Sequence, residues 1–278
     1  MTSSFSLLSL FGFALAFSAF ATDPRGLVDS TGGKNELLLS GVSHGLPGID
    51  LDTQNVERMA SHAAYKFHPN HADEAQGTSS NVAAELTRLS EAVGNDGTLF
   101  FYFSGHGSPG SLYMQDGSMS ISKIRKALET GRAKLGPMQR LVMMFDSCYS
   151  GSLLDPVRDV LPLGQIFRPE IASELFADEA FRQLTPSRAN DDGDVGEEPP
   201  IEYWKKLFVF ASSRADETSL AGETGSVFTV ALGKAYDEVI ESNATLGDWV
   251  KKTQEYTVGH HPVARFAPAT LEAEVMKP

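Results

Sequence analysis

Short apolar runs alternate with amphipathic segments along most of the chain. Continuous apolar runs predict buried strands at residues 36–42, 98–103, 141–145 and 207–211. Apolar positions at helical spacing predict helices at residues 52–65, 79–93, 120–128, 226–240 and 246–258. Strands that are apolar throughout are typical of a parallel sheet covered on both faces. The pattern therefore predicts an α/β fold: a mostly parallel sheet with helices on both faces.

The first 21 residues differ in composition from the rest of the chain. They carry no charged side chain, and residues 7–20 are mostly apolar. Ala19-Phe20-Ala21 then supplies the small-x-small pattern of a signal peptidase site. A membrane anchor is the alternative, but the run is shorter than a comfortable span. We expect a signal peptide at 1–21 that is removed, no stable membrane insertion afterwards, and a secreted or periplasmic protein with one domain at 22–278.

An acidic segment interrupts the predicted domain at about residues 155–200. It ends in Pro199-Pro200 and is too long for an ordinary connection between a strand and a helix. Two interpretations stay open, a tolerated surface insertion and a gating or cleavable loop beside the functional site.

The net charge and the single cysteine limit the classes of function that the chain can have. Asp and Glu outnumber Lys and Arg by 36 to 23, for a formal net charge of −13. Such a surface repels phosphate backbones, which argues against a nucleic-acid partner, and it attracts basic substrates. The single cysteine excludes an internal disulfide. In an exported protein an unpaired thiol is either buried and inert or used in chemistry.

A histidine and this cysteine each follow a predicted buried strand. Residues 98–103 run into Ser104-Gly105-His106-Gly107, and residues 141–145 run into Asp146-Ser147-Cys148-Tyr149-Ser150-Gly151. Ligands bind at the carboxyl ends of parallel strands, so both side chains are expected at one edge. An imidazole can deprotonate a thiol and later protonate a leaving amine. The backbone N–H groups of Gly107 and Cys148 are the natural oxyanion donors. The pattern predicts a cysteine peptidase.

These motifs resemble those of the caspase-haemoglobinase group of cysteine peptidases. Residues 106–110, His-Gly-Ser-Pro-Gly, and residues 148–152, Cys-Tyr-Ser-Gly-Ser, are similar to motifs of the legumain family. Residues 207–219 look like a later strand and loop of its bacterial members. Residues 103–107, 146–148 and 46–52 also resemble metacaspase motifs, although Ile49 stands where those have cysteine. The resemblance implies a three-layer fold, a secreted cysteine endopeptidase with a dyad of Cys148 and His106, a peptide or protein substrate, and no cofactor.

The resemblance also suggests a substrate pocket. The family places an acidic pocket residue at Asp146, which alternation puts on the same side as Cys148. If Asp52 and Asp216 face the same pocket, their carboxylates favour Lys or Arg before the scissile bond. Ser104 would line the wall. Arg214 could instead supply the cation that a legumain-like preference for Asn or Asp needs.

Several alternatives remain open at this stage. In caspases the position of the acidic loop holds a processed linker, so Arg182, Arg188 and Asn190 are candidate self-cleavage points, and an uncut loop is the alternative. Transpeptidase activity, and a catalytically silent relative that binds peptides, are the rival functions.

Other histidines are given minor roles. Ser43-His44-Gly45 is interpreted as a turn that ends a strand, and residues 68–71 as a polar loop rather than a metal site. His260 and His261 are expected to cap the C-terminus of a helix. No metal ligands are predicted.

Overall fold

The computed structural model describes residues 27–28, 33–62, 65–154 and 203–276. The predicted signal peptide at 1–21 and the acidic loop at 155–200, with Arg182, Arg188 and Asn190, lie outside the described residues. Within the described part, no helix has both the length and the apolar character needed to cross a membrane.

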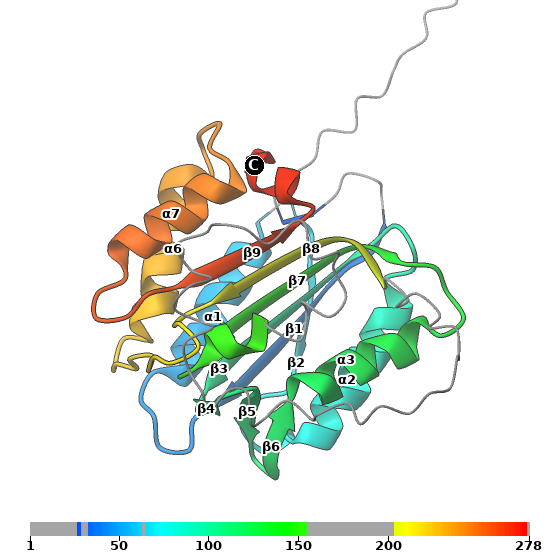
Figure 1. Ribbon diagram of the computed structural model, residues 1–278, viewed down its shortest axis with the longest axis horizontal. Helices are drawn as coiled ribbons and strands as arrows, with labels where there is room; N and C mark the ends of the chain where they lie inside the picture. Colours follow the sequence, from blue (N-terminus) through cyan, green and yellow to red (C-terminus); the bar gives the residue numbers. More distant parts are fainter. Residues whose placement is uncertain (1–26, 29–32, 63–64, 155–202, 277–278) are drawn as a thin grey trace, which may run out of the picture.

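Six strands form a central sheet in the order β2-β1-β3-β7-β8-β9, which crosses the middle of the molecule in Figure 1. They are β1 (Asn35–Val42), β2 (His68–His71), β3 (Thr98–Gly105), β7 (Met138–Asp146), β8 (Trp204–Ala211) and β9 (Val263–Ala267). All neighbours in this sheet are parallel except β9, which runs antiparallel to β8. The predicted, mostly parallel sheet is confirmed.

Helices cover both faces of the sheet, as predicted. They are α1 (Ile49–Ala60), α2 (Ser79–Ala92), α3 (Ile121–Arg132), α6 (Val227–Val239) and α7 (Leu246–Tyr256), with short 3-10 helices η1 (Glu74–Gln76) and η4 (Ala269–Ala273). The α2–α3 pair packs on one face, and α1, α6 and α7 pack on the other (Figure 1). The result is a three-layer α/β sandwich.

Alternation along the central strands divides the core between the two faces. In β3, Phe101 and Phe103 pack into the layer beneath α2 and α3, whereas Phe100 and Tyr102 pack against α1 and α6. Every residue of β3 is buried. Because a buried Phe or Leu side chain contributes roughly 1.5–3 kcal/mol, a strand that is apolar throughout gains stability on both faces. This explains why continuous apolar runs identified these strands.

Three structural features depart from the sequence-based expectations. Residues 68–71, expected to be a polar loop, form β2 at the edge of the sheet, where Pro69 is tolerated. Residues 107–120 fold into a small antiparallel sheet of β4 (Gly107–Ser108), β5 (Ser111–Met114) and β6 (Gly117–Ser120). Strand β9 was not predicted. All of these strands are short or have few apolar residues, so hydrophobic pattern alone does not reveal them.

Helix boundaries differ by a few residues from those expected. Helix α1 begins at Ile49, earlier than the predicted residue 52, and ends at Ala60 rather than 65. Its N-cap Gly48 has a φ of 74°, a conformation that favours glycine and ends the preceding turn. Thr78, not Ser79 or Ser80, caps α2 by accepting a hydrogen bond from the N–H of Asn81. Ser120 caps α3, as one of the two expected candidates.

Candidate active site

The carboxyl ends of β3 and β7 lie side by side at one edge of the sheet. The two strands are parallel neighbours, and Ser104 pairs in register with Asp146. His106 and Cys148 each stand two residues beyond this pair. The register therefore places His106-Gly107 and the only cysteine of the chain just beyond the same end of two neighbouring strands.

Gly107 shows how closely these two segments approach each other. A Cβ atom built at Gly107 would lie 2.5 Å from the carbonyl oxygen of Cys148 and 2.6 Å from Oγ of Ser147. Side chains do not tolerate such contacts, so only glycine fits at this position. The residue after His106 thus packs directly against the cysteine turn.

The cysteine turn is held by hydrogen bonds to the loop after β8. Ser147 N–H donates to Oγ of Ser212 at 3.1 Å, and Ser150 N–H donates to Oγ of Ser213 at 3.2 Å. Tyr149 has a φ of 58° and donates its N–H to the carbonyl of Glu217 at 2.7 Å. These bonds fix the backbone around the cysteine before any substrate arrives.

Cys148 is a half-buried residue and does not belong to the sealed core. Its Sγ lies 3.7 Å from the carbonyl oxygen of Ser219 and donates a weak hydrogen bond to it. The Cys148 N–H makes no hydrogen bond within the part of the chain that the structure describes. The thiol and this N–H are therefore both available for chemistry.

The backbone N–H of Gly107 is a second donor that makes no hydrogen bond within the small sheet. Tyr113 N–H donates to the carbonyl of His106 at 3.0 Å, which makes residues 106 and 113 a hydrogen-bonded pair. Because such pairs alternate in an antiparallel ladder, the next pair, Gly107 and Leu112, is non-hydrogen-bonded. The Gly107 N–H consequently points away from β5. Within the residues that the structure describes, neither the Gly107 nor the Cys148 N–H has a hydrogen-bond partner, and the oxyanion hole stays a prediction.

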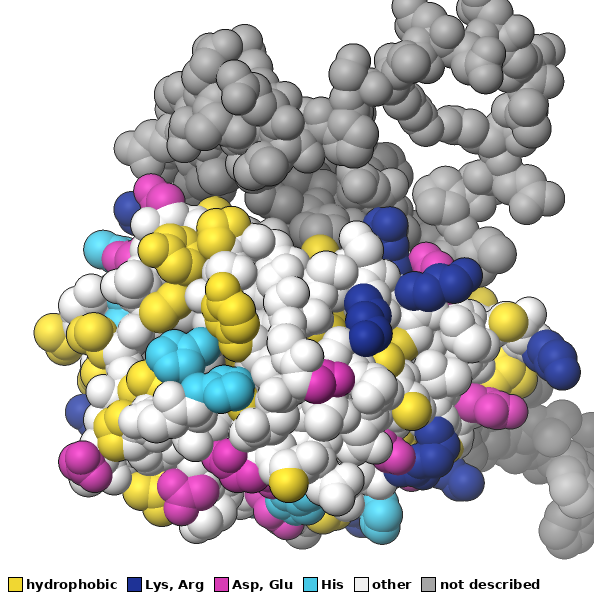
Figure 2. All heavy atoms as spheres, turned by 90° about the horizontal axis from the view of Figure 1, so that it is seen from below, with side chains coloured by type: hydrophobic (Ala, Val, Ile, Leu, Met, Phe, Trp, Pro, Cys, Tyr) yellow, Lys and Arg dark blue, Asp and Glu magenta, His cyan; other side chains and the backbone are white. Residues whose placement is uncertain are grey.

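His44 lies beside His106, although the sequence suggested only a turn there. The turn is present, since His44 has a φ of 43° just after β1. The two rings are 6.4 Å apart between centroids and tilted by 35°, and Nε2 of His44 lies 3.2 Å from the carbonyl oxygen of Met114. Figure 2, viewed from below Figure 1, shows histidine side chains adjoining one another beside apolar ones. His44 is thus a neighbour of the candidate site.

Asp52 and Asp146 form a buried carboxylate pair beside the site. Ser226 links them, because its N–H donates to Oδ1 of Asp52 at 2.7 Å while its hydroxyl donates to Oδ2 of Asp146. Ser104 also donates to Asp52, at 2.8 Å. Asp52 is fully buried and Asp146 is 3% exposed. The structure therefore brings together Asp52, Ser104 and Asp146, as the sequence suggested.

Burial raises the pKa values of both carboxyl groups, and their other neighbours differ. Burial, followed by the charge of Asp146, raises the pKa of Asp52 to about 8. Burial raises the pKa of Asp146 as well, but hydroxyls of Ser219 (3.2 Å) and Thr229 (2.6 Å) add to that of Ser226 and favour its anion. Burial and mutual repulsion therefore both oppose full ionisation of the pair.

Two other residues expected in the pocket, Arg214 and Asp216, lie in the loop after β8. Arg214 and Asp216 are exposed, and neither hydrogen-bonds to the buried pair. The backbone of Arg214 instead packs on Gly151, where a Cβ would lie 2.7 Å from its carbonyl carbon. Within the described residues, the pocket contributions expected of Arg214 and Asp216 therefore find no support in the hydrogen bonding.

His260 is a buried site neighbour that sequence reasoning missed. It is 2% exposed and its Nδ1 lies 2.6 Å from the carbonyl oxygen of Ser212, while its Nε2 has no hydrogen-bond partner among the described residues. Its proximity to Asp146 lowers the pKa of that carboxyl group. The expected helix cap is wrong, since α7 ends at Tyr256. His261 instead lies 2.7 Å from Glu217.

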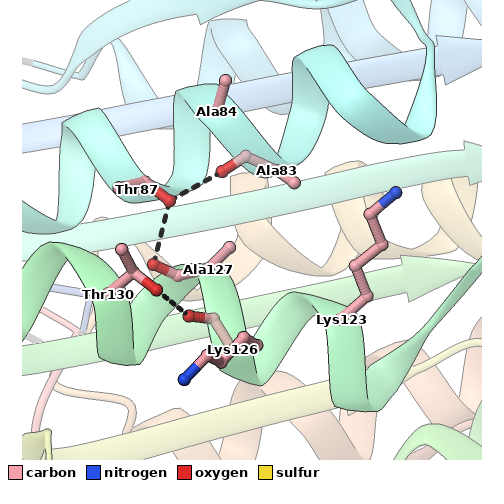
Figure 3. Close-up of a pocket in the computed structure, with 7 residues that line it drawn as sticks. All are labelled: Ala83, Ala84, Thr87, Lys123, Lys126, Ala127 and Thr130. Carbon is pink, nitrogen blue, oxygen red and sulfur yellow. Dashed lines mark hydrogen bonds between the residues drawn. The ribbon is translucent and has the colours of Figure 1, made fainter.

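The described surface also contains a shallow hollow of about 270 Å³ between α2 and α3 (Figure 3). It is lined by Ala83, Ala84, Thr87, Lys123, Lys126, Ala127 and Thr130. The hydroxyls of Thr87 and Thr130 donate to helix carbonyls, so neither has a free donor for a ligand. Among the described residues, no group of three or more metal-ligating side chains occurs.

Comparisons with known proteins agree with this geometry. The caspase domain family matches residues 36–257. A solved structure from Geobacter sulfurreducens has a TM-score of 0.59 at 16% identity, covering 88% of this chain and 98% of that one. Caspase-1 from Spodoptera frugiperda has a TM-score of 0.52 at 11% identity, covering 88% of each chain. Both likenesses show the fold alone. No curated protein matches the chain in sequence.

Proposed function

The chain belongs to the caspase domain family, and on that premise we propose that it is a cysteine endopeptidase cleaving after Lys or Arg. Membership implies a cysteine peptidase that acts on peptides or proteins. The proposal adds the dyad of Cys148 and His106, and the choice of a basic side chain. The legumain-like and metacaspase-like features of the motifs remain predictions.

The proposed reaction uses groups already at the strand edge. His106 takes the proton of the Cys148 thiol, and the thiolate attacks the scissile carbonyl carbon. The Gly107 and Cys148 N–H groups stabilise the oxyanion that forms. His106 then protonates the departing amine, which leaves an acyl-enzyme. Water, deprotonated by the same imidazole, hydrolyses the thioester and restores the thiol.

One observation carries the choice of substrate. Ser219 contacts both parts of the site, since its carbonyl oxygen lies 3.7 Å from the Cys148 sulfur and its hydroxyl 3.2 Å from Asp146. A single residue, Ser219, thus lies between the candidate nucleophile and the carboxylate pair. Among the described residues, no lysine or arginine pairs with either carboxylate. A cationic substrate side chain supplies the missing charge.

A panel of fluorogenic peptides tests the proposal. The peptides carry Arg, Lys, Asn or Asp before the reporter and are assayed under reducing conditions. We expect turnover of the Arg and Lys peptides by the wild type and none by Cys148→Ala. Preference for Asn or Asp would refute basic specificity and favour the legumain-like alternative. Absence of turnover with any peptide would favour a silent peptide-binding relative.

A matched pair of variants tests the pocket separately. Asp52 and Asp50 stand on the same helix, but Asp52 is fully buried whereas Asp50 is exposed. Losing a buried charge partner costs about 2–5 kcal/mol, so Asp52→Asn should lower kcat/KM for the Arg peptide by about 100-fold. Asp50→Asn should leave it unchanged. Equal effects of the two substitutions would argue against a pocket at the pair.

Transpeptidation is the remaining alternative chemistry. An added amine would compete with water for the acyl-enzyme, so mass spectrometry of products formed with glycinamide separates the two reactions. We expect the hydrolysed peptide to dominate. A predominant glycinamide adduct would mark the protein as a transpeptidase.

Export and loop processing complete the proposal. Removal of residues 1–21 gives a mature N-terminus at Thr22, which N-terminal sequencing of protein purified from the producing cells detects. Cleavage after Arg182, Arg188 or Asn190 gives two chains whose masses identify the point. We expect such cleavage in the wild type and not in Cys148→Ala. Identical intact masses after incubation would exclude self-processing.

A further inference from the structure

The loop at residues 212–219 holds the cysteine turn, residues 147–150, on both sides of the candidate nucleophile. Three of the four backbone N–H groups of the turn donate to this loop, and only that of Cys148 has no hydrogen-bond partner among the described residues. The three bonds are Ser147 to Ser212 Oγ (3.1 Å), Ser150 to Ser213 Oγ (3.2 Å) and Tyr149 to the Glu217 carbonyl (2.7 Å). The position of the free N–H, and of the thiol beside it, therefore depends on where the loop lies.

Ser212 connects the turn to the sheet. Its hydroxyl accepts from the Ser147 N–H and donates to the Ser147 carbonyl oxygen at 3.2 Å. Its own N–H donates to the carbonyl of Phe145, near the end of β7, at 2.9 Å. Ser212 is fully buried, so its carbonyl oxygen also needs a donor from within the protein.

His260, in the segment between α7 and β9, supplies that donor. Its Nδ1 lies 2.6 Å from the Ser212 carbonyl oxygen, and a carbonyl only accepts, so Nδ1 carries the proton. The residue is 2% exposed, and its buried Nε2 has no hydrogen-bond partner among the described residues. Since an unpaired buried nitrogen costs free energy, the bond to Ser212 is the contact that accounts for the position of the ring.

We propose that His260 is a positioning residue for Cys148. Its Nδ1–H holds the Ser212 carbonyl, and the Ser212 hydroxyl in turn holds the backbone that carries the thiol and the Cys148 N–H. In this role His260 touches no substrate and needs no charge. The inference rests on the proposed function for its effect on catalysis, whereas the anchoring of the turn can be measured without a substrate.

Two substitutions of nearly equal shape separate the hydrogen bond from the packing. His260→Asn places an amide N–H near the position of Nδ1 and can still donate to Ser212, although it lacks the ring and its charge interaction with Asp146. His260→Leu fills a similar volume and has no donor. His261→Ala is the matched control, because the His261 ring is exposed in an ion pair with Glu217, and such pairs contribute little. The backbone N–H of residue 261 still bonds to Glu217 in this control.

Hydrogen exchange followed by mass spectrometry measures the anchoring directly. Peptides that cover the cysteine turn report its amides, and peptides from β3 report the core in the same experiment. His260→Leu should speed exchange in the turn by at least about tenfold and leave β3 unchanged, because the lost bond loosens the turn locally. His260→Asn and His261→Ala should exchange within about threefold of wild type. His260→Ala, which also lacks the donor, takes the place of His260→Leu if that variant does not fold.

The arginyl peptide assay measures the consequence for catalysis. Small displacements of reacting groups cost up to about 100-fold in rate, so His260→Leu should lower kcat by at least about tenfold. KM should stay within about threefold of wild type, because the change does not touch the bound peptide. His260→Asn should restore most of the lost kcat.

The outcomes separate the inference from the function on which it rests. Unchanged exchange in the turn of His260→Leu would overturn the inference, whether or not peptides are cleaved. Equal losses in His260→Asn and His260→Leu would also overturn it, because the ring and not the bond would then matter. Faster exchange with an unchanged kcat would refute the positioning role. If the wild type cleaves none of the peptides, the proposed function fails by itself, and the exchange rates still decide whether His260 anchors the turn.

Discussion

Replacing Asp52 by Asn should stabilise the protein while it weakens the proposed pocket. In the native state burial raises the pKa of Asp52 to about 8, against an ordinary value of 3.8. The folded protein then binds this proton more tightly than the unfolded chain does, so the stability due to this group falls as pH rises from 3.8 to 8. Asparagine keeps the shape of the side chain and cannot ionise. It can still accept from the N–H of Ser226 and face the hydroxyl of Ser104.

The size of the effect follows from the pKa of Asp52. One pKa unit corresponds to about 1.4 kcal/mol, so keeping Asp52 in its site at pH 7 costs the native protein on the order of 4 kcal/mol. The free energy of unfolding of Asp52→Asn, minus that of the wild type, should therefore grow by about 1.4 kcal/mol per pH unit from pH 5 to pH 7. Above about pH 8 the difference should be constant, because the acid is then ionised in both states.

Urea unfolding followed by circular dichroism measures this difference. Wild type, Asp52→Asn and Asp50→Asn are compared from pH 5 to pH 9, and subtraction removes the contribution of every group that titrates alike in all three. Asp50 is exposed, so its difference curve should be flat. A flat curve for Asp52→Asn would refute the reasoning, because it would mean that Asp52 is no harder to ionise in the folded protein than in the unfolded chain.

Three other substitutions probe the packing of the site and the core. Gly107→Ala should lower kcat/KM in the peptide assay by at least about 100-fold, because the added Cβ would lie 2.5 Å from a carbonyl oxygen of the cysteine turn. Gly136→Ala is the control: its added Cβ would have its nearest atom at 3.4 Å, and its kcat/KM should stay within about threefold of wild type. Ser226→Ala removes both the cap of α6 and a donor to the buried carboxylates, and should cost about 2–4 kcal/mol in urea unfolding; a loss below about 0.5 kcal/mol would contradict this. Phe208→Ala, in the core between β8 and α7, should destabilise by about 3–5 kcal/mol, and an unchanged Tm would disprove the packing described.

The sheet was predictable because its central strands are buried on both faces. Residues 98–103 and 141–145 are continuous apolar runs, and they form most of β3 and β7. Strand β2 was missed because an edge strand buries little: His68 and His71 are exposed and Pro69 is only half-buried. Its pairing depends on the neighbouring β1, which no local pattern in residues 68–71 reveals.

The residues of the candidate site were likewise predictable only in part from the sequence. Asp146 ends a strand whose position was predictable and Ser104 lies near the end of its neighbour, so the register pairs them, with Cys148 and His106 two residues further on. Asp216 was expected as a carboxylate and Arg214 as an alternative cation of the same pocket; both side chains are exposed in the loop after β8, and their roles stay predictions. The links to Ser226 on one side and His260 on the other join segments far apart in the chain. Such long-range contacts leave no signal in a single sequence.

Covalent labelling of Cys148 tests the central claim most directly. Peptidyl acyloxymethyl ketones with Arg or Asp at the recognition position are incubated with wild type and His106→Ala, and the adduct is located by peptide mass spectrometry. The account predicts one adduct on Cys148, formed by the arginyl probe at least about 100-fold faster than by the aspartyl probe, and nearly absent in His106→Ala. Equal rates for the two probes, or an undiminished rate in His106→Ala, would contradict it.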